Sequence, residues 1–325
     1  MNSFTIDTTA PSLSQVTAVS TPDNDSTPSY TFSSTEAGVI TYSGGCGSSS
    51  SSATSDNNTV ILTQSDNSTA LSDATYNCTI RVTDNASNTS SALSVTQFVI
   101  DTTGPTVAEV TAVNTPGNDT TPRYIFSSNE AGTITYGGSC SSSDNSSTAS
   151  NNTIDFNTLS VGSYSDCTIR VTDTSGNPSN TLAVSSFTIE TTAPTVSSIY
   201  PTDNLSGISI STDNISVTFS ESMDNTSVTS NTSNTSCSGS IQLSSDNFAS
   251  CVQMGSSPTI SNSNRTFTVA PSLTMFYSTN YKIRITTAAS DIAGNTMASD
   301  NTTENGFNTT DRIPITAGYA HSCFM

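Results

Sequence analysis

Apolar and polar residues alternate in short runs along this chain, and the alternation is the main signal of its fold. Cys78, Ile80 and Val82 fall on one parity, and so do Phe267 and Val269. Because residues two apart lie on the same face of a strand, each run predicts a β-strand with one buried face. Turn-forming clusters such as TPDNDSTP separate the runs, as expected for the short strands of a β-sandwich. The pattern predicts an all-β fold.

Longer stretches recur with spacings that are close to constant. YTFSSTEAGVITY from Tyr30 returns as YIFSSNEAGTITY from Tyr124, 94 positions later, and CTIRVTD from Cys78 returns unchanged from Cys167, 89 positions later. A unit of roughly 90 residues is about the size of one immunoglobulin-like (Ig-like) sandwich. The recurrence predicts tandem Ig-like β-sandwiches in a linear array.

A short junction occurs three times and marks the predicted domain boundaries. It reads FTIDTTAPSL from Phe4, FVIDTTGPTV from Phe98 and FTIETTAPTV from Phe187. Each copy is an alternating strand that runs into an acidic residue, two threonines and a proline, which fixes φ and restricts the residue before it. The predicted parts are a leftover last strand (1–9), Ig-like domain 1 (10–103), Ig-like domain 2 (104–192), a third Ig-like domain of a different kind (193–310) and the start of a truncated module (311–325).

The composition narrows the classes of function. Charged residues make up 10% of the chain, against about 25% in typical soluble domains. The formal net charge is −19 with seven basic residues, so the basic patch typical of nucleic-acid binding is absent. The acidity leaves two interpretations open, namely solubility and cation binding.

The first residues have neither a basic start nor an apolar core, so they do not resemble a signal peptide. The sequence also contains no apolar run long enough to insert into a membrane. Residues 1–7 match the last strand of a repeat whose body is missing. We therefore expect a fragment of a longer protein, with any targeting signal upstream and covalently adjoining modules at both ends.

The seven cysteines give three pairs and one remainder, Cys323. Alternation places the repeated cysteines on the inward face of their strands; Cys46, for example, shares its parity with Ile40, Tyr42 and Gly44. The absence of a C-x-x-C motif and the single histidine argue against a zinc site and favour disulfides in an oxidising compartment. Each closed loop would stabilise its domain by about 3–4 kcal/mol on the chain-entropy model. The predicted pairs are Cys46–Cys78, Cys140–Cys167 and Cys237–Cys251.

The third unit carries the most specific resemblance. PTVSSIYPTDNLSGISISTDNISVTFSESMD, from Pro194 to Asp224, resembles the opening of the SbsA Ig-like domain of bacterial surface proteins. That family shows a proline-led first strand, a P-x-D/N turn and a strand that ends in F-S-E-x-M-D. YKIRITTAASDIAGNTMAS, from Tyr281, resembles its closing strand and D-x-A-G-N turn. The resemblance implies a β-sandwich, exposure at a surface and a role in a stalk or in adhesion.

The other units carry looser resemblances. The first two are similar to bacterial Ig-like repeats through DTTAP-type junctions and the V-T-D-x-x-x-N element at Val82 and Val171. The tail ITAGYAHSCFM, from Ile315, resembles the start of a regulator-of-chromosome-condensation repeat, although Phe324 stands where alanine is usual. That second resemblance implies a β-propeller farther along the full protein.

Residues that could carry catalysis are missing from the sequence. The single histidine, His321, lies in the tail, which excludes most Ser-His-Asp and Cys-His arrangements within the domains. The glycines at GGCGSSS have no lysine and no helix after them, so they are not a phosphate loop. We expect no enzyme activity.

Acidic residues at turns and junctions are the best functional candidates. Asp and Asn stabilise tight turns through their own backbones, which is the interpretation that we favour. The alternative is calcium, since hard oxygen ligands from a loop and a linker can converge where two domains meet. Some bacterial Ig-like adhesins are similar in using calcium at such joints. The candidates are Asp84, Asp173 and Asp291, which open the turns DNASN, DTSGN and DIAGN, and the junction acids Asp7, Asp101 and Glu190.

These features predict a structural spacer of a secreted or cell-surface bacterial protein that presents distal modules. One alternative is an adhesin whose Ig-like domains bind a glycan or a host protein directly, which a contiguous exposed aromatic or apolar patch would favour. The absence of tryptophan favours the spacer, because tryptophan is common at binding hot spots. A third possibility is an accessory region of a secreted enzyme. The sequence predicts no nucleic-acid partner and an extracellular or cell-surface location.

Overall fold

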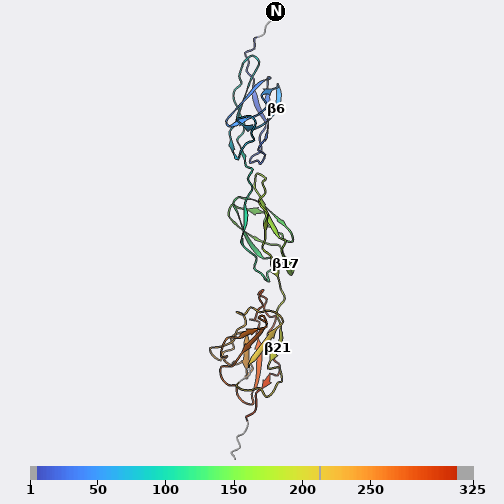
Figure 1. Cartoon of the computed structure of the whole chain (residues 1–325), viewed down its shortest axis with the longest axis vertical. Helices are drawn as coiled ribbons and strands as arrows, with labels where there is room; N and C mark the ends of the chain where they lie inside the picture. The colour runs from blue at the N-terminus through green and yellow to red at the C-terminus, as the bar shows by residue number, and fades with distance from the viewer. Residues whose placement is uncertain (1–5, 212–213, 313–325) are drawn as a thin grey trace, which may run out of the picture. The chain divides into compact units, whose positions relative to one another are not determined.

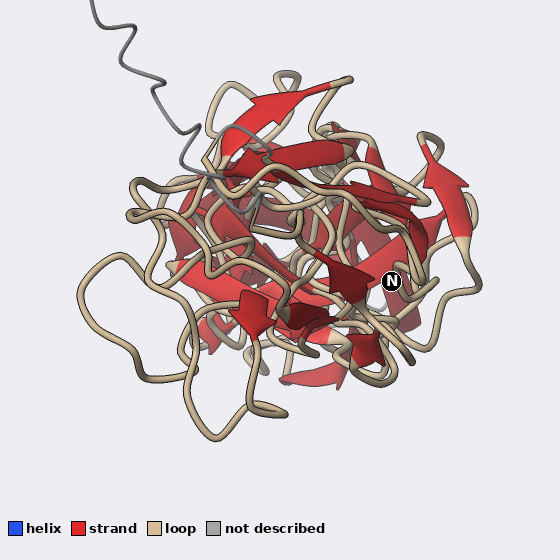
Figure 2. Ribbon diagram, turned by 90° about the horizontal axis from the view of Figure 1, so that it is seen from below, coloured by secondary structure: helices blue, strands red, loops and turns tan. Residues whose placement is uncertain are grey.

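The computed structural model describes residues 6–211 and 214–312 (Figure 1). Throughout these residues the chain forms strands and loops and no helix (Figure 2), so the predicted all-β fold is confirmed. The described part of the chain accordingly has no helical segment that could cross a lipid bilayer. The predicted motif from Ile315, with His321 and Cys323, lies outside the described residues.

Eleven strands, which we call the first strand group, pair among themselves. They form sheets in the orders β1-β2-β6, β10-β9-β3-β5, β11-β8 and β4-β7, and the paired strands within these sheets run antiparallel. Residues 6–12 precede them and form no strand. The strands are β1 (Leu13–Thr17), β2 (Ser29–Ser34), β3 (Gly38–Ser43), β4 (Cys46–Gly47), β5 (Ser52–Ala53), β6 (Asp56–Ile61), β7 (Thr63–Gln64), β8 (Ala74–Tyr76), β9 (Thr79–Thr83), β10 (Leu93–Ser94) and β11 (Phe98–Ile100).

The second strand group repeats most of this arrangement. Its sheets have the orders β12-β13-β16, β15-β14-β18-β19 and β17-β20. The strands are β12 (Val107–Thr111), β13 (Arg123–Ser128), β14 (Gly132–Gly137), β15 (Ser146–Ser147), β16 (Asn151–Asp155), β17 (Gly162–Tyr164), β18 (Thr168–Thr172), β19 (Leu182–Ala183) and β20 (Phe187–Ile189).

The third strand group has a different topology. Its sheets have the orders β21-β22-β25-β24 and β23-β26-β27, with β28 also paired to β26. The strands are β21 (Val196–Tyr200), β22 (Ile215–Phe219), β23 (Ile241–Ser244), β24 (Thr259–Ser261), β25 (Thr266–Val269), β26 (Asn280–Ile285), β27 (Asn301–Thr302) and β28 (Phe307–Asn308).

The described part of the chain divides into two compact units. The division runs through the second strand group, so the predicted boundaries at 103/104 and 192/193 stay a prediction. The first unit comprises the chain up to Val113 with Thr121–Asn157 and Ser165–Ser186, and the second comprises Asn114–Thr120, Thr158–Tyr164 and the chain from Phe187 onward.

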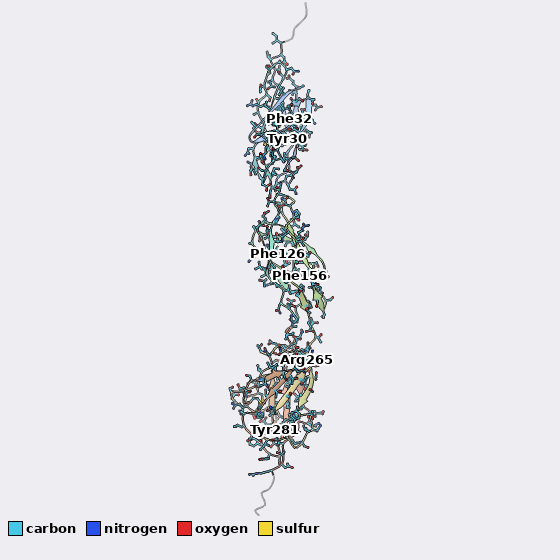
Figure 3. The ribbon with its side chains drawn as sticks, in the orientation of Figure 1. Tyr30, Phe32, Phe126, Phe156, Arg265 and Tyr281 are labelled. Atoms are coloured by element: carbon cyan, nitrogen blue, oxygen red, sulfur yellow. A yellow bond between two sulfur atoms is a disulfide. The ribbon has the colours of Figure 1, made fainter. Side chains whose placement is uncertain are left out.

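Small cores of alternating residues hold the sheets together. In β2 and β13 every second side chain is buried, as the alternation predicts. Stacked aromatic pairs fill these cores. The ring centroids of Tyr30 and Phe32 lie 6.4 Å apart, and those of Tyr124 and Phe156 lie 6.0 Å apart. Figure 3 labels Tyr30, Phe32 and Phe156. Buried aromatic side chains supply large apolar area, which compensates for the low apolar content of the chain.

Three disulfides join the cysteines that the sequence pairs. They connect Cys46 to Cys78, Cys140 to Cys167 and Cys237 to Cys251, across 32, 27 and 14 positions of the sequence. Five of the six cysteines are buried, Cys237 being the exception. Cross-links over loops of this length stabilise small domains mainly by restricting the unfolded chain. The oxidising compartment that they imply stays a prediction.

One local prediction was wrong. The shared parity of Ile40 and Cys46 predicts one alternating strand, but β3 ends at Ser43 and Cys46 lies in β4, which pairs with β7. Gly44 and Gly45 separate the two strands with φ of 81° and 89°, a region that favours glycine. The turn redirects the chain, although Cys46 is still buried.

Candidate functional site

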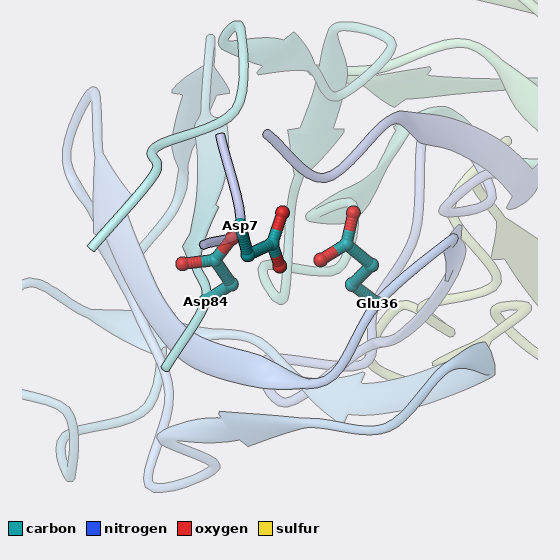
Figure 4. A group of neighbouring side chains, drawn as sticks. All are labelled: Asp7, Glu36 and Asp84. Atoms are coloured by element: carbon teal, nitrogen blue, oxygen red, sulfur yellow. The ribbon is translucent and has the colours of Figure 1, made fainter. Parts of the chain in front are cut away.

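Three groups of three carboxylates bring together residues that lie far apart in the sequence. Within each group one carboxylate oxygen per residue lies within 4.8 Å of the others. Figure 4 shows the carboxylates of the first group converging from three separate segments. We name them the first triplet (Asp7, Glu36, Asp84), the second triplet (Asp101, Glu130, Asp173) and the third triplet (Glu190, Glu221, Asp291).

The six acidic residues predicted from the sequence fall into these triplets in pairs. Each pair consists of one junction acid and one turn aspartate. A glutamate that the sequence reasoning missed completes each triplet: Glu36, Glu130 or Glu221. A signal was present, because Glu36 and Glu130 occupy equal offsets in the repeats SSTEAG and SSNEAG, and Glu221 lies in the FSE of the third unit.

Strand ends position the members of a triplet. In the second triplet, Asp101 follows β11, Glu130 lies two residues after β13, and Asp173 follows β18 directly. The side chains at these positions, beyond the ends of the strands, are partly exposed to solvent. The register of the strands therefore fixes where the carboxylates stand.

The turn aspartates stabilise their own turns, which is the interpretation favoured from the sequence. Asp173 accepts hydrogen bonds from the backbone N–H of Asn177 at 2.8 Å and from its side-chain amide at 3.0 Å. Asp84 and Asn88 form the same pair of bonds, at 2.8 and 2.9 Å. Such bonds are the usual reason for aspartate in a tight turn.

The asparagine of each turn also holds the junction. The Asn177 side-chain amide donates to the backbone oxygen of Asp101 at 2.8 Å, while Asn295 donates to that of Glu190 at 3.1 Å. Asn88 donates to the backbone oxygen of Asp7 at 3.2 Å. We call this contact the amide clasp. Because one amide binds both the turn aspartate and the junction, the clasp brings their two carboxylates together.

The glutamates experience the accumulated negative charge. Burial raises the pKa of Glu130 above its ordinary value, and Asp101 and Asp173 raise it further. The pKa of Glu36 is raised in the same way by burial, then by its two triplet neighbours. A positive charge placed between these carboxylates would relieve the repulsion.

The third triplet differs in one respect. Burial raises the pKa of Glu221, and Asp291 and Glu190 raise it further, but Arg265 acts in the opposite direction. A guanidinium near the glutamate partly neutralises the site. The third triplet is therefore the one that needs a further cation least.

The donor set suits calcium. Carboxylate oxygens are hard ligands, and calcium accepts six to eight of them in flexible geometry. The first triplet lines an open hollow of about 550 Å³, together with Thr35, Ala37, Ser55, Asn85 and Ala86. The hollow leaves room for the water ligands that would complete a coordination shell.

Comparison with known proteins supports an Ig-like fold for one part of the chain. Residues 190–310, which contain the third triplet, match the family of the bacterial Ig-like domain. The finer resemblance to the SbsA domain stays a prediction. No curated protein matches the chain.

Several solved structures of tandem domains resemble the chain at low similarity. Domains A168–A170 of titin share 12% identity and a TM-score of 0.34, covering 92% of this chain and 99% of that one. A structure from a 1.5-MDa bacterial ice-binding adhesin shares 14% identity and a TM-score of 0.32, covering 93% and 100%. Immunoglobulin domains 1–5 of Sidekick-1 share 9% identity and a TM-score of 0.32, covering 94% and 60%.

Proposed function

We propose that this chain is a non-catalytic structural spacer of a secreted or cell-surface bacterial protein, and that its acidic triplets bind calcium. The match of residues 190–310 to the bacterial Ig-like domain supports the class of protein. Three disulfides within the strand groups support an oxidising location. In this role the domains carry load and present other modules, and they do not act on a substrate.

One observation carries the calcium proposal: the same donor set recurs three times at equivalent places in the chain. Each triplet combines a junction acid, a glutamate after a strand and a turn aspartate. The turn hydrogen bonds alone need only the aspartate and the asparagine. Turn chemistry therefore gives no reason for the glutamate, whereas a cation does.

Calcium at a junction would stiffen the spacer. In the second triplet the ion would connect Asp101, at the end of β11, to Glu130 and Asp173, which follow β13 and β18. The amide clasp of Asn177 already joins two of these segments. An ion coordinated by all three carboxylates would also attach the segment of Glu130. It would restrict rotation of the chain at the junction.

Calcium titration by calorimetry tests the proposal, using the whole chain and two matched variants. Glu130→Gln keeps the shape of the side chain and removes its charge from the second triplet. Glu304→Gln makes the same change at an exposed glutamate outside the triplets. We expect Glu130→Gln to lose one binding site relative to the parent chain and Glu304→Gln to lose none.

Small-angle scattering then tests the mechanical role. We expect the parent chain to sample a narrower range of overall dimensions in calcium than in chelator. The same narrowing should be smaller for Glu130→Gln. Equal heats for all three proteins would reject a calcium site at the second triplet. Binding without any change in scattering would retain the sites and reject the stiffening.

A further inference from the structure

One turn of the third strand group contains Asn305–Gly306, the only Asn–Gly pair in the sequence. The turn lies between β27 and β28. An Asn–Gly pair is especially prone to deamidation, because glycine has no side chain to hinder attack by its own backbone nitrogen on the asparagine side chain. The pair is therefore a candidate modification site, and its surroundings decide whether it reacts.

The backbone of this turn requires the glycine. Gly306 has φ of 74°, and a Cβ atom at this position would lie 2.2 Å from the backbone oxygen of Tyr281. The next residue, Phe307, is buried, and its ring stacks on that of Tyr281 with 5.9 Å between centroids. The turn that places Phe307 in the core thus cannot replace the glycine by a less reactive neighbour.

Asp203, three residues after β21, binds both residues of the pair. Its carboxylate accepts hydrogen bonds from the backbone N–H of Asn305, at 2.9 and 3.2 Å, and from that of Gly306, at 2.5 Å. The Asn305 side-chain amide donates to the same carboxylate at 3.2 Å. One carboxylate therefore holds both the nucleophilic nitrogen and the amide that this nitrogen would attack.

The carbonyl groups of the pair are bound as well. The Asn280 side-chain amide donates to the backbone oxygen of Asn305 at 2.9 Å, and the Asn204 N–H donates to that of Gly306 at 2.6 Å. Every backbone polar group of the pair thus has a hydrogen-bond partner, so any rotation of this turn breaks several bonds.

Deamidation would begin at the Gly306 nitrogen. This nitrogen loses its proton and forms a bond to Cγ of Asn305, while the bond from Cγ to Nδ2 breaks and ammonia leaves. Water then opens the succinimide ring to give aspartate or isoaspartate. The hydrogen bond to Asp203 restrains the nitrogen in its N–H form, and the charge of the carboxylate disfavours a second anion beside it.

We propose that Asp203 protects Asn305 from deamidation and thereby keeps β28 in place. Either product of the reaction would disturb this strand. An aspartate product would set a second carboxylate against Asp203, and the two like charges would repel. An isoaspartate product would lengthen the backbone directly before Gly306 and Phe307. Asp203 and Asn305 lie outside the acidic triplets, so this inference does not depend on calcium binding.

Peptide mapping by mass spectrometry tests the proposal. The whole chain is incubated at neutral pH, and aspartate and isoaspartate at position 305 are measured over time in the parent and in Asp203→Asn. We expect the reaction to be at least about tenfold faster in the variant, since a hydrogen bond to a charged acceptor outweighs a tenfold change in rate. Asn262, which precedes a serine in the exposed turn between β24 and β25, is the internal reference and should react equally in both proteins.

Two controls separate protection from a general loss of stability. Ile283→Val removes one methylene group from the core at β26, so it lowers stability without touching Asp203, and it should leave the rate at Asn305 unchanged. The parent chain unfolded in urea should react at Asn305 at least about tenfold faster than the folded parent. The urea comparison tests the proposal even where Asp203→Asn does not fold.

Three outcomes would overturn the proposal. Equal rates in the parent and in Asp203→Asn would show that the carboxylate gives no protection. A folded parent that reacts as fast as the unfolded chain would show that the turn itself gives none. A slower reaction in Asp203→Asn would mean that Asp203 acts as a base that removes the Gly306 proton.

Discussion

Glu130→Gln should change stability in opposite directions with and without calcium. In chelator the substitution removes a negative charge whose oxygen lies within 4.8 Å of those of Asp101 and Asp173. One such repulsion costs about 1 kcal/mol at the dielectric constant of water, and two neighbours at a partly exposed site give about 1–2 kcal/mol in total. The variant should therefore be the more stable protein in chelator.

The pH dependence follows from the direction of the shift. The folded state raises the pKa of Glu130 above its ordinary value of 4.5, so ionised Glu130 lowers stability. That cost is absent below the ordinary pKa and develops as the pH rises through the folded pKa. The advantage of Glu130→Gln in chelator should accordingly vanish below pH 4.5 and be complete at neutral pH.

In calcium the sign should reverse, since the parent chain gains binding energy that the variant has lost. A ligand at one hundred times its dissociation constant stabilises by about 2.7 kcal/mol, which exceeds the repulsion. Thermal unfolding followed by circular dichroism measures both conditions, with Glu304→Gln as control. If Glu130→Gln shifts the transition equally in calcium and in chelator, the second triplet is not a calcium site.

Four further substitutions test how the turns are built, each by thermal unfolding. Ser87 has φ of 73° where the equivalent Gly176 has 94°, so Ser87→Gly should stabilise by up to about 1 kcal/mol and Gly176→Ser should destabilise; no difference would mean that Ser87 is unstrained. Asn177→Ala removes the amide clasp and should cost about 2–3 kcal/mol, and a loss below about 0.5 kcal/mol would contradict its role. Gly44→Ala sets an added Cβ against the Asn77 carbonyl oxygen at φ of 81°, so we expect a loss above about 1 kcal/mol, and neutral behaviour would refute the turn.

The period of the sequence was sufficient to predict the strands but not their ends. Ile80 and Val82 alternate and are buried in β9, because alternation reports directly which face meets the core. Gly44 has the parity of a strand residue, yet it forms a turn. Alternation cannot distinguish the two cases, since glycine has no side chain to reveal where it points.

The sequence predicted two of the three residues in each candidate site, for a related reason. Asp101 and Asp173 lie in turns and junctions whose chemistry is local, so the sequence indicates them. Glu130 belongs to the site only because β13 ends near both. Contacts between residues 29 and 43 positions apart depend on how the strands are arranged, and one repeat pattern does not determine that arrangement.

The amide clasp has a consequence for how such a chain can evolve. The clasp takes its carbonyl from the segment before a strand group and its asparagine from a turn inside that group. Glu190 fills the junction position before the third strand group as Asp101 does before the second, although the two groups differ in topology. The same hydrogen-bonded connection therefore joins strand groups of different topology. Recombination can add, remove or exchange whole strand groups. Each new neighbour is then held by the same connection, without any change inside the strand groups.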